Sequence, residues 1–275
     1  MITNCELPLQ LLEQNYQLND FDFVLFHLYS TNVKYREYYQ QMRKVHPERL
    51  MILDNSAYEF FVKGETLDMR SFVKAIAELK PDYYILPDVL QNKNATLDGI
   101  KKFCDEYGLL ISDGKFISRP MAVPQGKDSD ELVECIYEIR SLCIDYIGIP
   151  FHLPFYQYGY VADDIRYEFY TTYGEENDDI RYAMGRVQWM RDHEELLKKF
   201  DKVHLLGSHC PLEKVFYKDY YSMDTGYPVK LGMEGIELEK EKGKPKTIID
   251  DFLNSNISDE QMEMIRKNIN KFKKY

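Results

Sequence analysis

Short apolar runs that alternate with longer helical patterns constrain the fold of this chain more than any other feature. The runs are too short for helices and rich in β-forming residues, so they indicate buried parallel strands. We predict strands at Phe21–Ser30, Arg49–Ser56, Asp82–Val89, Ser118–Gly126, Asp145–Phe151, Lys202–Ser208 and Tyr220–Gly226. We predict helices at Val33–Val45, Leu67–Leu79, Lys93–Tyr107, Ser129–Cys143, Asp179–Phe200, Leu212–Lys218 and Ser258–Phe272.

This alternation predicts βαβ units and an α/β fold with a parallel sheet. A length of 275 residues is ordinary for a (β/α)8 TIM-type barrel, with an eighth strand that is weak or missing. We predict one domain over residues 1–275, with a long insertion at about 152–178 and a C-terminal helical tail at about 258–275. A doubly wound sheet is the alternative, although the chain contains neither G-x-G-x-x-G after its first strand nor a P-loop.

Composition limits the classes of protein that need considering. Hydrophobic residues make up 44% of the chain, which is enough for a full core. The chain has no apolar run of about 18 residues and no signal-peptide pattern, so we expect no membrane contact. Five scattered cysteines without a C-x-x-C pair indicate a reduced, cytoplasmic protein. The formal net charge of −11 argues against broad, non-specific binding of nucleic acid.

Polar residues follow the apolar runs, at the strand ends where a barrel builds its active site. These residues are His27, Asp54, Asn55, Ser56, Asp88, Gln125, Gly126, Gly148, His152, Gly207, Ser208, His209 and Asp224. Any one of them is more often structural than catalytic. Three aspartates among these strand ends, however, predict a site that binds Mg²⁺, shares protons or stabilises a cation.

Histidine placement argues against a zinc hydrolase, because the chain has no H-x-H or H-E-x-x-H motif. His204 lies alone in a predicted strand, and we expect it to be a core residue. Glycosyl transfer fits the polar set better. One carboxylate stabilises or attacks the anomeric carbon, and a second group manages the proton. Aspartate beside Gln125 also suits a purine-like base, because the two side chains accept from N–H groups and donate to a carbonyl.

The order of these motifs resembles the tRNA-guanine transglycosylase superfamily, and within it the DpdA-like, phage-type branch that places 7-deazaguanine in DNA. The resemblance covers about Phe21 to Leu231. "LDNSAYE" is similar to the family's D-S-G-G-[FY]-Q segment, "LPDV" to its second aspartate segment and "AVPQG" to its V-Q-G segment. "IGIPF" stands at its Gly-rich base-binding segment, "HLLGSHCPLE" resembles M/L-G-x-G-x-P-x-[DE], and "SMDTGYP" resembles the segment with the nucleophile.

The resemblance implies a role for each matching residue. Asp224 is the expected nucleophile at C1′ of a nucleoside in the nucleic acid, and Asp54 the expected acid or base. The expected substrate-binding residues are Asp88, Gln125, Gly148, Tyr58, Ser56, His27 and Gly207. Arg186 lies on a helix with Arg181 and Arg191, and we expect it to bind phosphate; salt bridges to the neighbouring acidic loop are the alternative.

Departures from the family change the expected partners. The family's tRNA enzymes carry a C-x-C-x-x-C…H zinc site after the nucleophile segment, whereas "VKLGMEGIELEKEKGKPK" has no cysteine. We therefore expect no metal and no cofactor, and DNA that contains guanine rather than tRNA as the polymer. The second substrate would be a free 7-deazaguanine of the preQ0 type, and a protein partner could supply DNA affinity. "NSAY" replaces the family's Gly-Gly, which makes a tighter turn at Ser56 and Ala57.

Two other functions remain open from the sequence. A nucleoside hydrolase or deoxyribosyltransferase would use the same barrel and aspartates on free nucleosides. A non-catalytic barrel would only bind a nucleobase, and would keep its function when Asp224 is replaced by asparagine.

Overall fold

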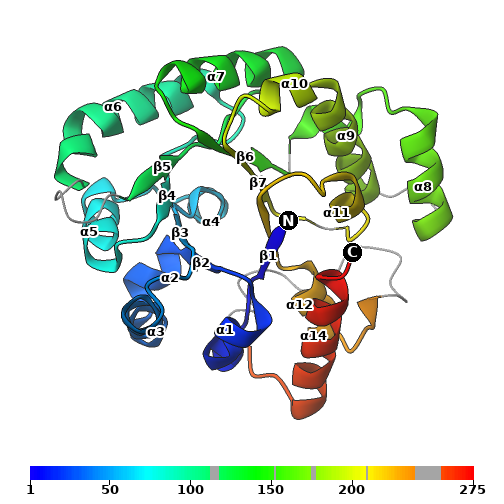
Figure 1. The fold of residues 1–275 in the computed structure, drawn as a ribbon, viewed down its shortest axis with the longest axis horizontal. Coiled ribbons are helices and arrows are strands. Elements are labelled where there is room, and N and C mark those ends of the chain that lie inside the picture. The colour runs from blue at the N-terminus through cyan, green and yellow to red at the C-terminus, as the bar shows by residue number, and fades with distance from the viewer. Residues whose placement is uncertain (112–117, 152, 175–177, 209, 239–254) are drawn as a thin grey trace. The chain divides into compact units, whose positions relative to one another are not determined.

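The structure is a computed structural model that describes residues 1–111, 118–151, 153–174, 178–208, 210–238 and 255–275. It contains two four-stranded sheets of parallel strands, with helices between successive strands (Figure 1). The predicted α/β class is therefore confirmed. The strand pairings of the described residues do not form a complete ring, so a closed barrel is not shown.

The chain divides into two compact units. Unit 1 consists of Met1–Asp20 together with Ile149–Tyr275, and unit 2 consists of Phe21–Gly148. The prediction of one domain over the whole chain stays a prediction.

Unit 2 contains a sheet with the order β2-β3-β4-β5. Its elements are β2 (Asp22–Leu25), α2 (Phe26–Thr31), α3 (Val33–Val45), β3 (Met51–Asp54), α4 (Ala57–Lys63), α5 (Met69–Leu79), β4 (Tyr83–Ile85), α6 (Lys93–Ile111), β5 (Arg119–Met121) and α7 (Ser129–Ser141). Every residue of β2 and β4 is buried, as is typical of parallel strands covered on both faces. An isolated parallel bridge also pairs Ala122 with Ile147.

Unit 1 contains the other sheet, with the order β1-β8-β7-β6. Its elements are β1 (Ile2–Cys5), η1 (Leu9–Gln14), α1 (Asn15–Leu18), η2 (Pro154–Gln157), α8 (Asp163–Tyr173), α9 (Asp178–Asp192), α10 (Glu194–Leu197), β7 (Lys202–Leu206), α11 (Glu213–Phe216), β8 (Ser222–Thr225), α12 (Tyr227–Met233) and α14 (Asp259–Phe272). Strand β6 (Tyr146–Pro150) starts within the last residues of unit 2 and ends in unit 1. The register pairs His204 with Ser222 and Asn4 with Asp224.

Local sequence signals explain where several helices begin. Ser258 and Gln261 form a capping box at the start of α14, with each side chain bonded to the other residue's backbone N–H. Asp68, Asp128 and Asn32 accept backbone N–H groups in the first turns of α5, α7 and α3. These caps fix helix starts within two residues of the predicted positions.

Two expectations need correction. The eighth strand exists as β1, before the first predicted strand, and its buried Thr3 and Asn4 explain why it did not read as an apolar run. The first predicted strand is half helix, because β2 ends at Leu25 and α2 begins at Phe26. The residues that follow β8 form α12, with Tyr227 and Pro228 in its first turn, where proline is well tolerated.

The predicted insertion at about 152–178 contains η2 and α8, a helix that the sequence analysis did not predict. Its exposed aromatic residues concealed the apolar stripe made by Ile165, Phe169 and Tyr173, which are buried. None of the helices in the described ranges has the length and apolar character of a membrane span.

Candidate functional site

In unit 2, a hydrogen-bonded network follows the carboxyl ends of β3, β4 and β5. Asn55 Nδ2 donates to Asp88 Oδ1 at 2.8 Å, and Gln125 Nε2 donates to Asp88 Oδ2 at 2.7 Å. Asn55 and Gln125 are buried, and Gln125 also accepts from the backbone N–H of Gln91. We call Asn55, Asp88 and Gln125 the Asp88 network. The predicted strand ends therefore do bring Asp88 and Gln125 together.

The charge state of Asp88 is set by its surroundings. Burial raises the pKa of Asp88 from its ordinary 3.8 to about 6, and the hydrogen bonds from Asn55 and Gln125 limit the rise. At neutral pH the carboxylate is ionised and accepts two amide donors. Between its ordinary pKa of 3.8 and the raised pKa of about 6, Asp88 is mostly protonated, whereas an ordinary aspartate is mostly ionised.

Asp54 lies in the turn that joins β3 to α4. Its Oδ2 accepts the backbone N–H of Ser56 at 2.7 Å, so it stabilises the turn by a local Asx-type bond. Ser56 adopts φ 59°, a left-handed conformation that a non-glycine residue rarely takes. The Ser56 hydroxyl oxygen lies 3.0 Å from Nδ1 of His27 and accepts the His27 backbone N–H.

His27 therefore reaches this turn from the second residue of α2 and not from a strand end. It is buried, as is Ser56. Tyr58, on α4, is half exposed at 49%, so its ring is available to a flat ligand. Gly148, in β6, donates its N–H to Ala122 O at 2.8 Å, so that N–H is used by the β6 pairing.

In unit 1, Asp224 is held in one orientation at the carboxyl end of β8. His204 Nε2 lies 2.9 Å from Asp224 Oδ1, and the backbone N–H of Gly207 donates to the same oxygen at 3.1 Å. Asp224 is 4% exposed. All hydrogen bonds that the described residues donate to its side chain reach Oδ1, which leaves Oδ2 as the oxygen that can meet a substrate.

His204 is a buried residue of β7, as the sequence analysis expected. It faces Ser222 across the β7–β8 pair, with Nδ1 at 2.8 Å from Ser222 Oγ. Ser222 is fully buried, so these three residues do not form a serine nucleophile site in which the hydroxyl meets substrate. The S-x-D spacing places the side chains of Ser222 and Asp224 on the same face of β8. The β7–β8 register then brings His204 opposite them.

Arg186 does not lie where a phosphate could reach it, which corrects its predicted role. Its side chain is 0% exposed and forms an ion pair with Glu213, which is also fully buried. The surface arginines of α9 instead follow the alternative: Arg191 pairs with Asp164 of α8 at 2.7 Å, and Arg181 lies 3.9 Å from Asp178. The predicted strand-end residues His152 and His209 lie outside the described residues.

Thr225, and not Asp224, satisfies the turn that follows β8. Its Oγ1 accepts the backbone N–H of Tyr227 and donates to the carbonyl of Ser208. Asp224 is therefore not required as the cap of α12.

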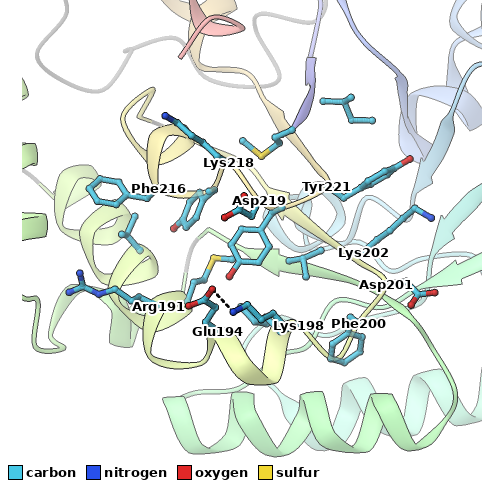
Figure 2. Close-up of a pocket in the computed structure, with 18 residues that line it drawn as sticks. Arg191, Glu194, Lys198, Phe200, Asp201, Lys202, Phe216, Lys218, Asp219 and Tyr221 are labelled. Carbon is cyan, nitrogen blue, oxygen red and sulfur yellow. Dashed lines mark ion pairs between the residues drawn. The ribbon is translucent and has the colours of Figure 1, made fainter.

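Figure 2 shows a pocket of about 790 Å³ in unit 1, at the amino ends of β1, β7 and β8. Arg191, Glu194, Lys198, Lys202, Lys218 and Tyr221 are among its lining residues. Lys198 pairs with Glu194 at 2.8 Å, and Lys202 Nζ lies 5.0 Å from the centre of the Tyr221 ring. None of the predicted site residues lines this pocket, because Asp224 and Gly207 lie at the opposite, carboxyl ends of the same strands.

Within the described ranges, no group of three or more His, Cys, Asp or Glu side chains is placed to hold a metal ion. A search of protein-family models found no match to this chain, and a search of curated proteins found no match either. The chemistry of the site therefore has to be argued from its geometry.

Proposed function

We propose that the protein is a base-exchanging glycosyltransferase that replaces guanine in DNA by a 7-deazaguanine base of the preQ0 type. Asp224 attacks C1′ of the target deoxynucleoside through Oδ2, the C1′–N bond breaks, and guanine leaves with the bonding electrons. A glycosyl ester to Asp224 results. The incoming 7-deazaguanine then takes the sugar back, and the Asp224 carboxylate is regenerated.

The observation that carries this proposal is the environment of Asp224. Oδ1 is fixed by His204 and by the Gly207 N–H, and the described residues donate no hydrogen bond to Oδ2. A nucleophilic carboxylate needs one oxygen free and a fixed direction of approach, because a displaced reacting atom loses a large part of the rate. A carboxylate that served only the turn would bond to that turn, which Thr225 does instead.

In this proposal the Asp88 network binds the base. A guanine-like ring presents an N–H face and a carbonyl, which match a carboxylate acceptor and an amide donor. Asp54 handles the proton on the departing or arriving base, and the half-exposed Tyr58 stacks on the ring. Gly148 and His27 remain proposed contacts.

The fold supports the same reading. Parallel strands that follow one another in each sheet, with helices between them, are the units of a TIM-type barrel, and we propose a complete (β/α)8 barrel without a zinc-binding subdomain. Two positions of left-handed backbone agree with the transglycosylase resemblance. Ser56, with φ 59°, and Gly207, with φ 60°, both match glycines of the family motifs.

The principal alternative is a hydrolase or deoxyribosyltransferase of free nucleosides, which would use Asp224 in the same way. A binding protein for nucleobases is favoured by the Asp88 network alone, because that network needs no nucleophile. The three functions differ in their need for a DNA polymer and for Asp224.

The direct test is to incubate the protein with duplex DNA and preQ0, digest the DNA, and look for the deazaguanine deoxynucleoside by mass spectrometry. We expect the modified nucleoside with wild-type protein and none with Asp224→Asn. Product from free deoxyguanosine at the same rate as from DNA would favour the nucleoside enzyme. Tight binding of preQ0 without product from any DNA, with or without added cell extract as a source of a partner, would favour the binding protein.

A further inference from the structure

A buried ion pair in unit 1 joins helix α9 to helix α11. The side chains of Arg186 and Glu213 are both 0% exposed, and Arg186 Nη2 contacts Glu213 Oε2. Burial raises the pKa of Glu213, and the attraction of Arg186 opposes that rise. Removing two charges from water is costly, and apolar replacements of such pairs are often neutral or stabilising. Stability alone is therefore a weak reason for this pair.

The pair also leaves polar atoms unsatisfied. Arg186 Nε and Glu213 Oε1 are buried and have no hydrogen-bond partner among the described residues, and the same is true of the nearby Tyr156 hydroxyl. Each unsatisfied buried group lowers stability. Because this cluster lowers stability, its role has to lie in the groups that the Arg186 side chain holds in place.

The remaining donors of Arg186 go to backbone carbonyls at the strand ends. Nη1 donates to Leu206 O at 3.0 Å, and Nη2 donates to Gly207 O at 2.9 Å. The guanidinium carbon also lies 4.8 Å from the centre of the Phe151 ring. The planar fork of arginine can hold two successive carbonyls and a carboxylate at once, which the single ammonium of lysine cannot do.

These contacts lead directly to Asp224. The peptide group between Leu206 and Gly207 presents its carbonyl to Arg186 and its N–H to Asp224 Oδ1, at 3.1 Å. A peptide group is planar and stiff, so fixing its carbonyl also fixes the direction of its N–H. Glu213 is therefore connected to Asp224 through the flexible Arg186 side chain and the rigid Leu206–Gly207 peptide plane.

We propose that Arg186, held by Glu213, is a positioning residue that sets the orientation of the Asp224 carboxylate through the Leu206–Gly207 peptide. This inference rests on the proposed function, because the orientation matters most if Asp224 is a nucleophile. Arg186 touches no substrate. Its removal lowers the rate of attack by Asp224 and leaves recognition of the base unchanged.

The test uses the full chain labelled with ¹³C′-leucine and ¹⁵N-glycine. Only Leu206-Gly207 and Leu231-Gly232 are Leu-Gly pairs in the sequence, so two amide signals are selected, and the one that moves in Asp224→Asn is Gly207. We compare Arg186→Lys and Glu213→Gln with Arg191→Lys, a matched control on the exposed, Asp164-paired arginine of the same helix. Arg186→Lys keeps the positive charge beside Glu213 but loses the planar guanidinium group. It therefore tests the positioning role while a charged pair is still present.

We expect both Arg186→Lys and Glu213→Gln to shift the Gly207 amide signal and to speed its hydrogen exchange at least about ten-fold, with no change in Arg191→Lys. With DNA and preQ0, kcat should fall by about 10- to 100-fold while KM for preQ0 stays the same. An unchanged Gly207 amide in both variants would overturn the positioning role, even if turnover fell. A shifted Gly207 amide in both variants, together with a wild-type protein that has no base-exchange activity, would instead overturn the proposed function and keep the structural link.

Discussion

At the scale of single residues, replacing Asp224 distinguishes a catalytic nucleophile from a structural carboxylate. Asp224→Asn keeps the size of the side chain and an oxygen for the Gly207 N–H, but it removes the charge that attacks C1′. We expect turnover on DNA to fall at least about 10³-fold. The free energy of unfolding should fall by only about 1–2 kcal/mol, the scale of one weakened hydrogen bond to a charged group.

Two measurements on the same protein samples check this expectation: urea unfolding followed by circular dichroism, and formation of the deazaguanine deoxynucleoside. Ser222→Ala is the matched control, because it removes the contact of His204 with Ser222 without touching the carboxylate. A large loss of stability in Asp224→Asn with turnover near the wild-type rate would make Asp224 a structural residue.

Asp88 should give the protein a characteristic pH dependence. Its pKa is about 6 when folded and about 3.9 when unfolded, so the folded state binds more protons between these values. The free energy of unfolding therefore falls as pH rises from about 4 to 6. The contribution is on the order of 1–2 kcal/mol after allowing for the partial exposure of Asp88.

Replacing Asp88 by asparagine should remove that component. As pH rises through this range, the unfolding free energy of wild type should fall relative to that of Asp88→Asn. Urea unfolding of both proteins at pH 4 to 7 measures this difference. Asp98→Asn, at an exposed position of α6, should run parallel to wild type. Parallel curves for Asp88→Asn as well would mean that Asp88 titrates normally.

Sequence reasoning placed the strand-end residues well and their partners less well. Asp54, Asp88, Gln125 and Asp224 follow β-forming runs, and the end of such a run is visible locally. The contact of His204 with Asp224 depends on the β7–β8 register, which no local pattern specifies. Arg186 was assigned to the surface because helical spacing alone does not show that a charged side chain is buried against Glu213.

At the scale of elements, the structure confirms α3 over Val33–Val45 and places α5, α7 and α14 within two residues of the predicted bounds. These helices have clear caps and an apolar face, which are properties of the local sequence. β1 lacks such a signal, because Thr3 and Asn4 are buried only through pairing with β8 from the far end of the chain.

Helix packing in unit 1 depends on Gly185. A Cβ at this position of α9 would lie 1.8 Å from the carbonyl oxygen of Tyr156 in η2, a distance that backbone atoms cannot accept. We expect Gly185→Ala to lower the free energy of unfolding by about 3 kcal/mol or more, because η2 and α9 must separate.

The same substitution in α6 should have the opposite sign. Gly108 lies in a helix, and a Cβ there would meet no atom within 4 Å. Gly108→Ala should raise the unfolding free energy by about 0.5–1 kcal/mol through helix propensity. Urea midpoints of the two variants measure both effects, and a stable Gly185→Ala protein would show that α9 and η2 pack differently from the structure.

At the scale of the whole molecule, the formal net charge of −11 limits how the proposed transglycosylase could hold DNA. A protein that neutralises six to ten phosphates loses about 10³- to 10⁵-fold in affinity between 50 and 200 mM salt. Repulsion between this acidic chain and the DNA backbone argues for few phosphate contacts. Affinity then has to come from the extruded base and, in the proposal, from a partner protein.

We therefore expect a shallow salt dependence for the protein alone. With about two phosphates neutralised, KM for duplex DNA should rise by about ten-fold between 50 and 200 mM salt, while KM for preQ0 stays nearly constant. Initial rates at several salt concentrations measure both constants, and a neutral inert solute serves as the control for viscosity. A rise of about 10³-fold or more would show that a basic DNA-binding surface outweighs the net charge. A KM for DNA without salt dependence, with equal activity on free deoxyguanosine, would assign the site to a nucleoside enzyme.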